Sequence, residues 1–84
     1  TQRIRQETEG EKGWPRLGSL LIRLGNYSLA EQIYTVLLNL TNDPLEVAQW
    51  HHQIGITKNH QEQHTQAIEC YEKSLKIYQK RLSH

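Results

Sequence analysis

The sequence predicts an all-α protein, with two pairs of antiparallel helices stacked as a short right-handed solenoid. The first observation behind this prediction is an internal repeat with an offset of 37 residues. A glycine, an alanine and a tyrosine recur in the same order: Gly18, Ala30 and Tyr34 in the first copy, Gly55, Ala67 and Tyr71 in the second. The second observation is that no segment alternates apolar and polar residues as a strand does.

The first pair of helices is marked by residues that typically end and begin helices. The first helix is expected over residues 14–24, because Gly25-Asn26 is suited to the left-handed conformation that follows a helix. Ser28 is expected to cap the second helix, with Glu31 three residues later completing a capping box.

The second pair of helices has similar signals. Asp43 can cap the third helix with Pro44 at its first position, and that helix is expected to reach Asn59 or His60. Thr65 is expected to open the fourth helix, which has no helix breaker up to the C-terminus.

These signals divide the 84 residues into three parts. Residues 1–12 are expected to be a polar N-terminal arm or the end of a preceding helix, residues 13–44 the first repeat, and residues 45–84 the second repeat with a long C-terminal helix. The chain starts at Thr1 and has no methionine, which favours a fragment of a longer protein.

The first copy resembles the tetratricopeptide repeat (TPR) family. It reads Trp14-x-x-Leu17-Gly18-x-x-Leu21, then Gly25-Asn26-Tyr27, then Ala30-x-x-x-Tyr34, with Pro44 later. The family pattern has a tyrosine where this chain has Leu21, and the second copy has His51 and Lys58 in place of the Trp and the Tyr. The resemblance covers residues 11–82 and implies a scaffold that binds a protein or peptide.

Helix packing explains why small residues recur at these positions. A Gly or Ala between two close helices leaves space that an aromatic side chain from the partner helix can fill. Gly18, Ala30, Gly55 and Ala67 are expected to leave such spaces, and Trp14, Tyr27, Tyr34 and Tyr71 to fill them. These aromatic residues are therefore assigned to the core.

Composition disfavours several classes of function. The net charge is +1 with interleaved signs, so nucleic acid is not an expected partner, although Arg3, Arg5, Lys12, Arg16 and Arg23 make the N-terminal quarter basic. No run of 18 apolar residues is present, so no membrane partner is expected. The single cysteine fits a reducing compartment, and a cytoplasmic location is expected.

Five histidines raise the possibility of a metal site: His51, His52, His60, His64 and His84. His60 and His64 have the i, i+4 spacing of helical zinc pairs, but they straddle the expected turn between the last two helices. Adjacent histidines on a helix point about 100° apart, which does not suit one ion. We expect no metal site.

Catalysis is not expected either. Glu69 and Glu72 beside Cys70 should raise the pKa of its thiol, which favours an inert cysteine. The sequence has no phosphate-binding glycine loop, nucleophile elbow or pair of catalytic carboxylates. We expect no enzyme activity and no cofactor.

The resemblance to the TPR family places the ligand on the concave face, which the first helix of each repeat lines. The corresponding residues are Lys12, Arg16, Ser19, Ile22 and Arg23 in the first repeat, and Gln49, His52, Gln53, Ile56, Asn59 and His60 in the second. Cations and amides dominate this set, so an acidic or polar peptide is expected. Ile56 occupies the place of an Asn in the carboxylate clamp of chaperone-binding members, which disfavours chaperone tails.

The last helix has an apolar stripe at heptad spacing. The stripe consists of Ile68, Tyr71, Leu75, Tyr78 and Leu82. One interpretation is that a following repeat covers it, and another, compatible with the first, is that this chain forms a homo-oligomer through the C-terminal helix.

Two finer resemblances refine the expected family. The segments 43–48 and 72–80 resemble the longer repeats of kinesin light chain. The segment 13–25 resembles the opening repeat of multi-repeat proteins that also carry an arginine ADP-ribosyltransferase domain. The second resemblance implies an alternative function, a regulatory or substrate-docking segment of a larger enzyme.

Overall fold

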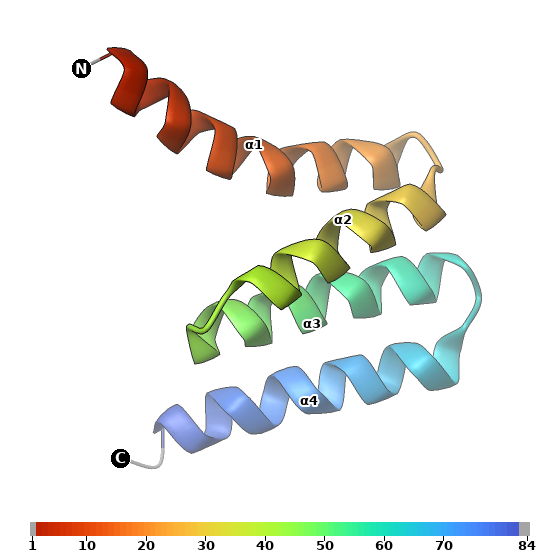
Figure 1. Ribbon diagram of the computed structural model, residues 1–84. Helices are drawn as coiled ribbons and strands as arrows, with labels where there is room; N and C mark the ends of the chain where they lie inside the picture. The colour runs from red at the N-terminus through yellow and green to blue at the C-terminus, as the bar shows by residue number, and fades with distance from the viewer. Residues whose placement is uncertain (1, 83–84) are drawn as a thin grey trace.

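The computed structural model describes residues 2–82, with side chains from residue 13 onward, and these residues form four helices and no strand. The helices are α1 (Gln2–Arg23), α2 (Tyr27–Leu40), α3 (Pro44–His60) and α4 (His64–Leu82). Each helix packs against the next one along the chain, so that the four lie side by side in one layer (Figure 1). The all-α fold of two helical hairpins is therefore confirmed.

Helix α1 begins well before the expected start near Trp14. It continues through Pro15, and the ribbon of α1 is bent rather than straight (Figure 1). Proline bends helices because it has no N–H to donate and its ring displaces the carbonyl four residues earlier. The end of α1 follows the prediction: Gly25 has a φ of +82°, and the Asn26 N–H donates to the Leu21 carbonyl at 2.8 Å.

The predicted capping box of α2 is wrong. Helix α2 starts one residue before Ser28, at Tyr27, and its N-cap Asn26 makes no side-chain capping hydrogen bond. The turn that closes α1 leads directly into α2 at Asn26, which leaves Ser28 inside the first turn. The carboxylate of Glu31 instead forms an ion pair with Lys58 of the neighbouring helix α3, with 2.9 Å between Oε2 and Nζ.

The start and end of α3 agree with the sequence prediction. A side-chain oxygen of Asp43 accepts a hydrogen bond from the Leu45 N–H at 3.1 Å, and Pro44 occupies the first helical position. The helix ends at His60, and α4 begins at His64, one residue before the expected Thr65. Glu62 forms the connection with a φ of +63°.

The predicted packing of small against aromatic residues is confirmed at both repeats. A Cβ on Gly18 would lie 2.6 Å from Cζ of Tyr34, and one on Gly55 would lie 2.7 Å from Cε1 of Tyr71. Each tyrosine thus occupies the space that the missing side chain leaves. Ala30 and Ala67, the recurring alanines, are both buried.

The expectation that Trp14 fills the core is wrong, since 52% of this residue is exposed. Trp50 on α3 takes that role: its ring stacks on Tyr34 with 6.0 Å between the ring centroids. Tyr27 does contact a neighbouring helix, because its ring stacks on His60 of α3 at 5.1 Å. The contact between α2 and α3 therefore has an aromatic pair at each of two levels.

Candidate functional site

A groove of about 420 Å³ lies between α1 and α3, above the middle of α2. Its lining combines the polar side chains Arg16, Ser19 and Arg23 of α1 and Gln49 and Gln53 of α3 with Pro15, Leu20, Tyr34 and Trp50. The five polar residues are all among those expected on the concave face. Two helices that are not neighbours in the sequence thus present their polar faces to one space.

The floor of the groove is aromatic and fixed in position. Tyr34 is only 1% exposed, and its hydroxyl donates to the Pro15 carbonyl oxygen at 3.3 Å. The hydroxyl groups of Ser19 and Tyr34 also share a hydrogen bond, with 3.3 Å between their oxygen atoms. Trp50 supports the ring from α3. A ligand would therefore meet a rigid floor.

The described rim of the groove carries positive charge. Arg16 and Arg23 are exposed, and the lining residues that the structure describes include no Asp or Glu. A guanidinium group can donate two parallel hydrogen bonds to a carboxylate. Gln49 and Gln53 add amide groups that can both donate to and accept from a peptide backbone. This chemistry suits an acidic segment in an extended conformation.

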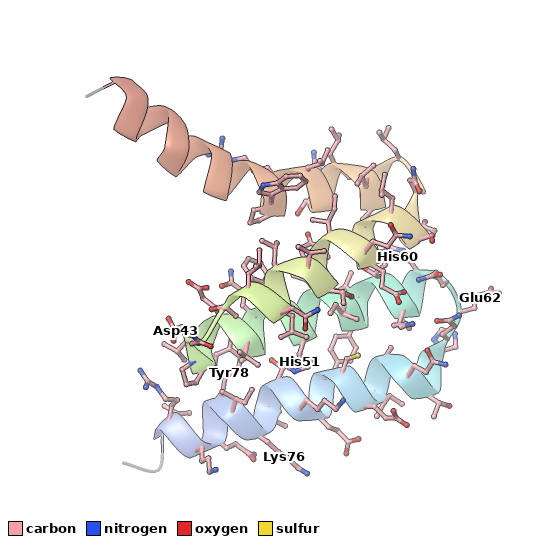
Figure 2. All side chains as sticks on the ribbon, in the orientation of Figure 1. Asp43, His51, His60, Glu62, Lys76 and Tyr78 are labelled. Atoms are coloured by element: carbon pink, nitrogen blue, oxygen red, sulfur yellow. The ribbon has the colours of Figure 1, made fainter. Side chains whose placement is uncertain are left out.

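Several residues expected in the groove lie elsewhere. Ile22 is half-buried and packs against the core on both sides of α2. His60 stacks on Tyr27, and Asn59 is 2.6 Å from Nδ1 of His64 at the turn before α4. Figure 2 shows His60 at this end of the stack.

His52 and Ile56, which were also expected in the groove, form no part of its described lining. His52 tilts against Tyr71 at 5.4 Å and borders a second hollow, of about 480 Å³, with Ser74, Leu75 and Tyr78. Ile56 is half-buried on α3. The side chain of Lys12 lies outside the described residues.

Sequence reasoning missed the floor of the groove. Tyr34 was assigned only to the core, yet its ring also borders the groove. Trp50 gave no signal in the repeat comparison, because its equivalent in the first repeat is Gly13. The only cue for Trp50 was that a large aromatic residue stood one position before His51, the counterpart of Trp14.

The apolar stripe of α4 is only partly covered. Ile68, Leu75, Tyr78 and Leu82 are exposed, whereas Tyr71 is half-buried because it fills the space at Gly55. Lys76, which is not part of the stripe, points away from the other helices (Figure 2).

His60 and His64, which have the spacing of a helical zinc pair, lie on either side of the turn and have different partners. Among the described residues, no three or more His, Cys, Asp or Glu side chains come together as metal ligands would. Burial lowers the pKa of His51, and the charge of Lys73 lowers it further. His84 lies outside the described residues.

The pKa of the Cys70 thiol is raised, as the sequence predicts, but burial is the main cause. Lys73 and Lys58 oppose the shift, while Glu31 and Glu69 add to it. A raised pKa reduces the reactive thiolate form.

The ion pair between α2 and α3 shifts the pKa of Glu31 downward. Burial alone would raise it, but hydrogen bonds from Lys58 and Gln61 and the charge of Lys58 outweigh that effect. The Gln61 amide donates to the carboxylate at 3.1 Å. The contact between α2 and α3 therefore ends in a polar cluster.

None of the helices, over the residues described, combines the length and apolarity needed to cross a membrane.

Two family models described as tetratricopeptide repeat match the chain, one over residues 16–48 and the other over residues 48–81. Comparison with curated proteins and with solved structures gave no match.

Proposed function

We infer the function from the premise that this chain belongs to the tetratricopeptide repeat family. Repeats of this family generally mediate interactions between proteins. We propose that the groove between α1 and α3 binds an acidic, extended segment of a partner protein, and that the chain acts as a scaffold without catalytic activity.

The main support for this proposal is the positive charge of the groove. Arg16 and Arg23 stand on the same rim, and no carboxylate among the lining residues neutralises them. The Gln49 and Gln53 amides face them across the space from α3. A basic or neutral peptide would leave both guanidinium groups without an anionic partner.

The distance between the two arginines indicates how the acids of the ligand should be spaced. Seven residues of helix separate Arg16 from Arg23, which corresponds to a rise of about 10.5 Å. In an extended peptide of polyproline II conformation, three residues span about 9 Å and bring the side chains at i and i+3 to the same face. We therefore expect a preference for two acidic residues at positions i and i+3 of the ligand.

The finer predictions rest on the sequence alone. A kinesin-light-chain-like repeat type, a cytoplasmic location and the alternative role as a docking segment of a larger enzyme, such as an arginine ADP-ribosyltransferase, stay predictions. The groove proposal has support from named side chains and is the one to test first.

The experiment uses fluorescent peptides with two glutamates at varied spacing in a serine and alanine background. We expect the i, i+3 peptide to bind most tightly, and the double variant Arg16→Glu with Arg23→Glu to lose at least about tenfold in affinity, as two favourable charge pairs become repulsive. Added salt should weaken the wild-type complex.

The matched control is Lys73→Glu with Lys76→Glu on the exposed surface of α4, which changes the net charge by the same amount. This variant should bind nearly as well as the wild type. Equal losses in both double variants would mean that only net charge matters, and lysine peptides binding as well as glutamate peptides would contradict the proposal.

A further inference from the structure

Each end of the helical layer presents exposed aliphatic side chains. At the α1 end, Leu17 is 40% exposed and Leu24 is 71% exposed. At the α4 end, Ile68 is 57% exposed and Leu75 is 55% exposed. Soluble proteins seldom leave clusters of large apolar residues uncovered without a binding partner.

The internal repeat shows what each end is shaped to contact. Inside the chain, α2 of the first repeat packs on α3 of the second, and this contact can be divided into two faces. The α2 face includes Glu31, Tyr34 and Leu38, and the α3 face includes Trp50, Ile54, Lys58 and Gln61.

Because of the 37-residue repeat, the residues of these two faces have equivalents at the two ends of the helical layer. The α2 residues Glu31, Tyr34 and Leu38 correspond to Ile68, Tyr71 and Leu75 on α4. Ile54 of α3 and Gln61, the residue directly after α3, correspond to Leu17 of α1 and Leu24, the residue directly after α1. The exposed residues at the α4 end are thus equivalent to one side of an existing interface, and those at the α1 end to the other side.

Two sets of equivalent residues are also chemically matched, although the stack of Tyr34 on Trp50 has no counterpart, since Gly13 stands at the position equivalent to Trp50. Glu31 and Gln61, which are hydrogen-bonded inside the chain, correspond to Ile68 and Leu24 at the two ends. Leu38 and Ile54, which belong to one apolar cluster, correspond to Leu75 and Leu17. Both contacts between the ends would therefore join two aliphatic side chains.

We propose that a second copy of this chain docks head to tail, with the α4 face of one copy (Ile68, Tyr71, Leu75) on the α1 face of the next (Leu17, Leu24) in the manner of α2 on α3. The two faces are different, so a dimer formed in this way still has one free face of each kind. Further copies can add to these free faces. The concave groove is not part of the contact.

The test uses sedimentation velocity of the wild type and of one variant for each face. The wild type should show a mean mass that increases with concentration. Leu24→Glu should block the α1 face and Ile68→Glu the α4 face, and each variant alone should be monomeric. Circular dichroism should show wild-type helix content for both, since the substituted side chains are exposed.

Mixing the two blocked variants distinguishes a head-to-tail contact from a symmetric one. Leu24→Glu keeps an intact α4 face, and Ile68→Glu keeps an intact α1 face. The mixture should therefore form a one-to-one dimer and no larger species. If α4 packed symmetrically on α4, Leu24→Glu would still dimerise alone and the mixture would form no mixed dimer. Either of these results overturns the proposal.

A second measurement does not depend on those variants. Leu24→Cys and Ile68→Cys, each in a Cys70→Ser background, should form a mixed disulfide when combined under mild oxidation, faster than either forms with itself. Equal rates for all pairings would contradict the proposal. A wild type that remains monomeric up to millimolar concentration would also overturn it, and would leave another repeat or a different protein as the occupant of these faces.

Discussion

The ring of Tyr34 occupies the space where a side chain on Gly18 would stand. A Cβ at Gly18 would lie 2.6, 2.8 and 2.9 Å from three atoms at the end of the tyrosine side chain. The same hydroxyl group reaches Pro15 and Ser19, so one residue both closes the core between α1 and α2 and forms the floor of the groove. Packing and binding surface are therefore linked at this position.

We expect Gly18→Ala to destabilise the protein by about 1 kcal/mol, because overpacking costs ~1–3 kcal/mol and the better helix propensity of alanine offsets up to ~1 kcal/mol. Urea unfolding measures the effect. Gly13→Ala is the control on the same helix, since a Cβ there has no neighbour within 4 Å, and it should stabilise the protein. Equal stabilisation by both substitutions would show that Tyr34 does not need this space.

The Glu31–Lys58 pair should make stability depend on pH. The pKa of Glu31 is lowered in the folded state, so the pair stabilises the fold above the ordinary glutamate pKa, and this contribution is lost as pH falls through the lower, folded-state pKa. At neutral pH, Glu31→Gln should lower the free energy of unfolding by about 0.5–1 kcal/mol.

The measurement is urea unfolding of the wild type and Glu31→Gln across acidic and neutral pH. The difference between them should shrink toward the acid end. Glu72→Gln, at an exposed position of α4, is the control and should change stability little at any pH. A difference for Glu31→Gln that stays constant with pH would mean that the charge of Glu31 does not stabilise the contact between α2 and α3.

The two helix N-caps with known geometry should respond differently to alanine. Asp43→Ala removes the hydrogen bond to the Leu45 N–H and should cost about 1 kcal/mol. Asn26→Ala removes a side chain that makes no capping bond and should cost much less. Thermal unfolding of the two variants compares them directly, and similar losses would refute the assignment of Asp43 as the functional cap.

The sequence predicted those features that depend on local chemistry. Asp43-Pro44 defined the start of α3 because capping and the fixed φ of proline act within one turn. Gly25 marked the end of α1 for the same reason. The Ser28–Glu31 capping box failed because Glu31 finds a partner on α3, and a pairing between helices leaves no trace in local spacing.

The groove was predictable only in part. The resemblance to the TPR family placed Arg16, Ser19 and Arg23 on the concave side of α1, and the groove lies there. It could not tell that Ile22 turns into the core or that Trp50, rather than Trp14, stacks on Tyr34. Those details depend on how two helices are rotated against each other, which the pattern of a single helix does not define.

The most direct test of the proposed function is to map the bound peptide onto the chain by NMR, using the tightest of the acidic peptides. Backbone amide shifts should change most at Arg16, Ser19 and Arg23 on α1 and at Gln49 and Gln53 on α3, and the Trp50 indole signal should move with them. Shift changes confined to the outer surface of α4, with these groove signals unmoved, would contradict the assignment of the groove as the binding site.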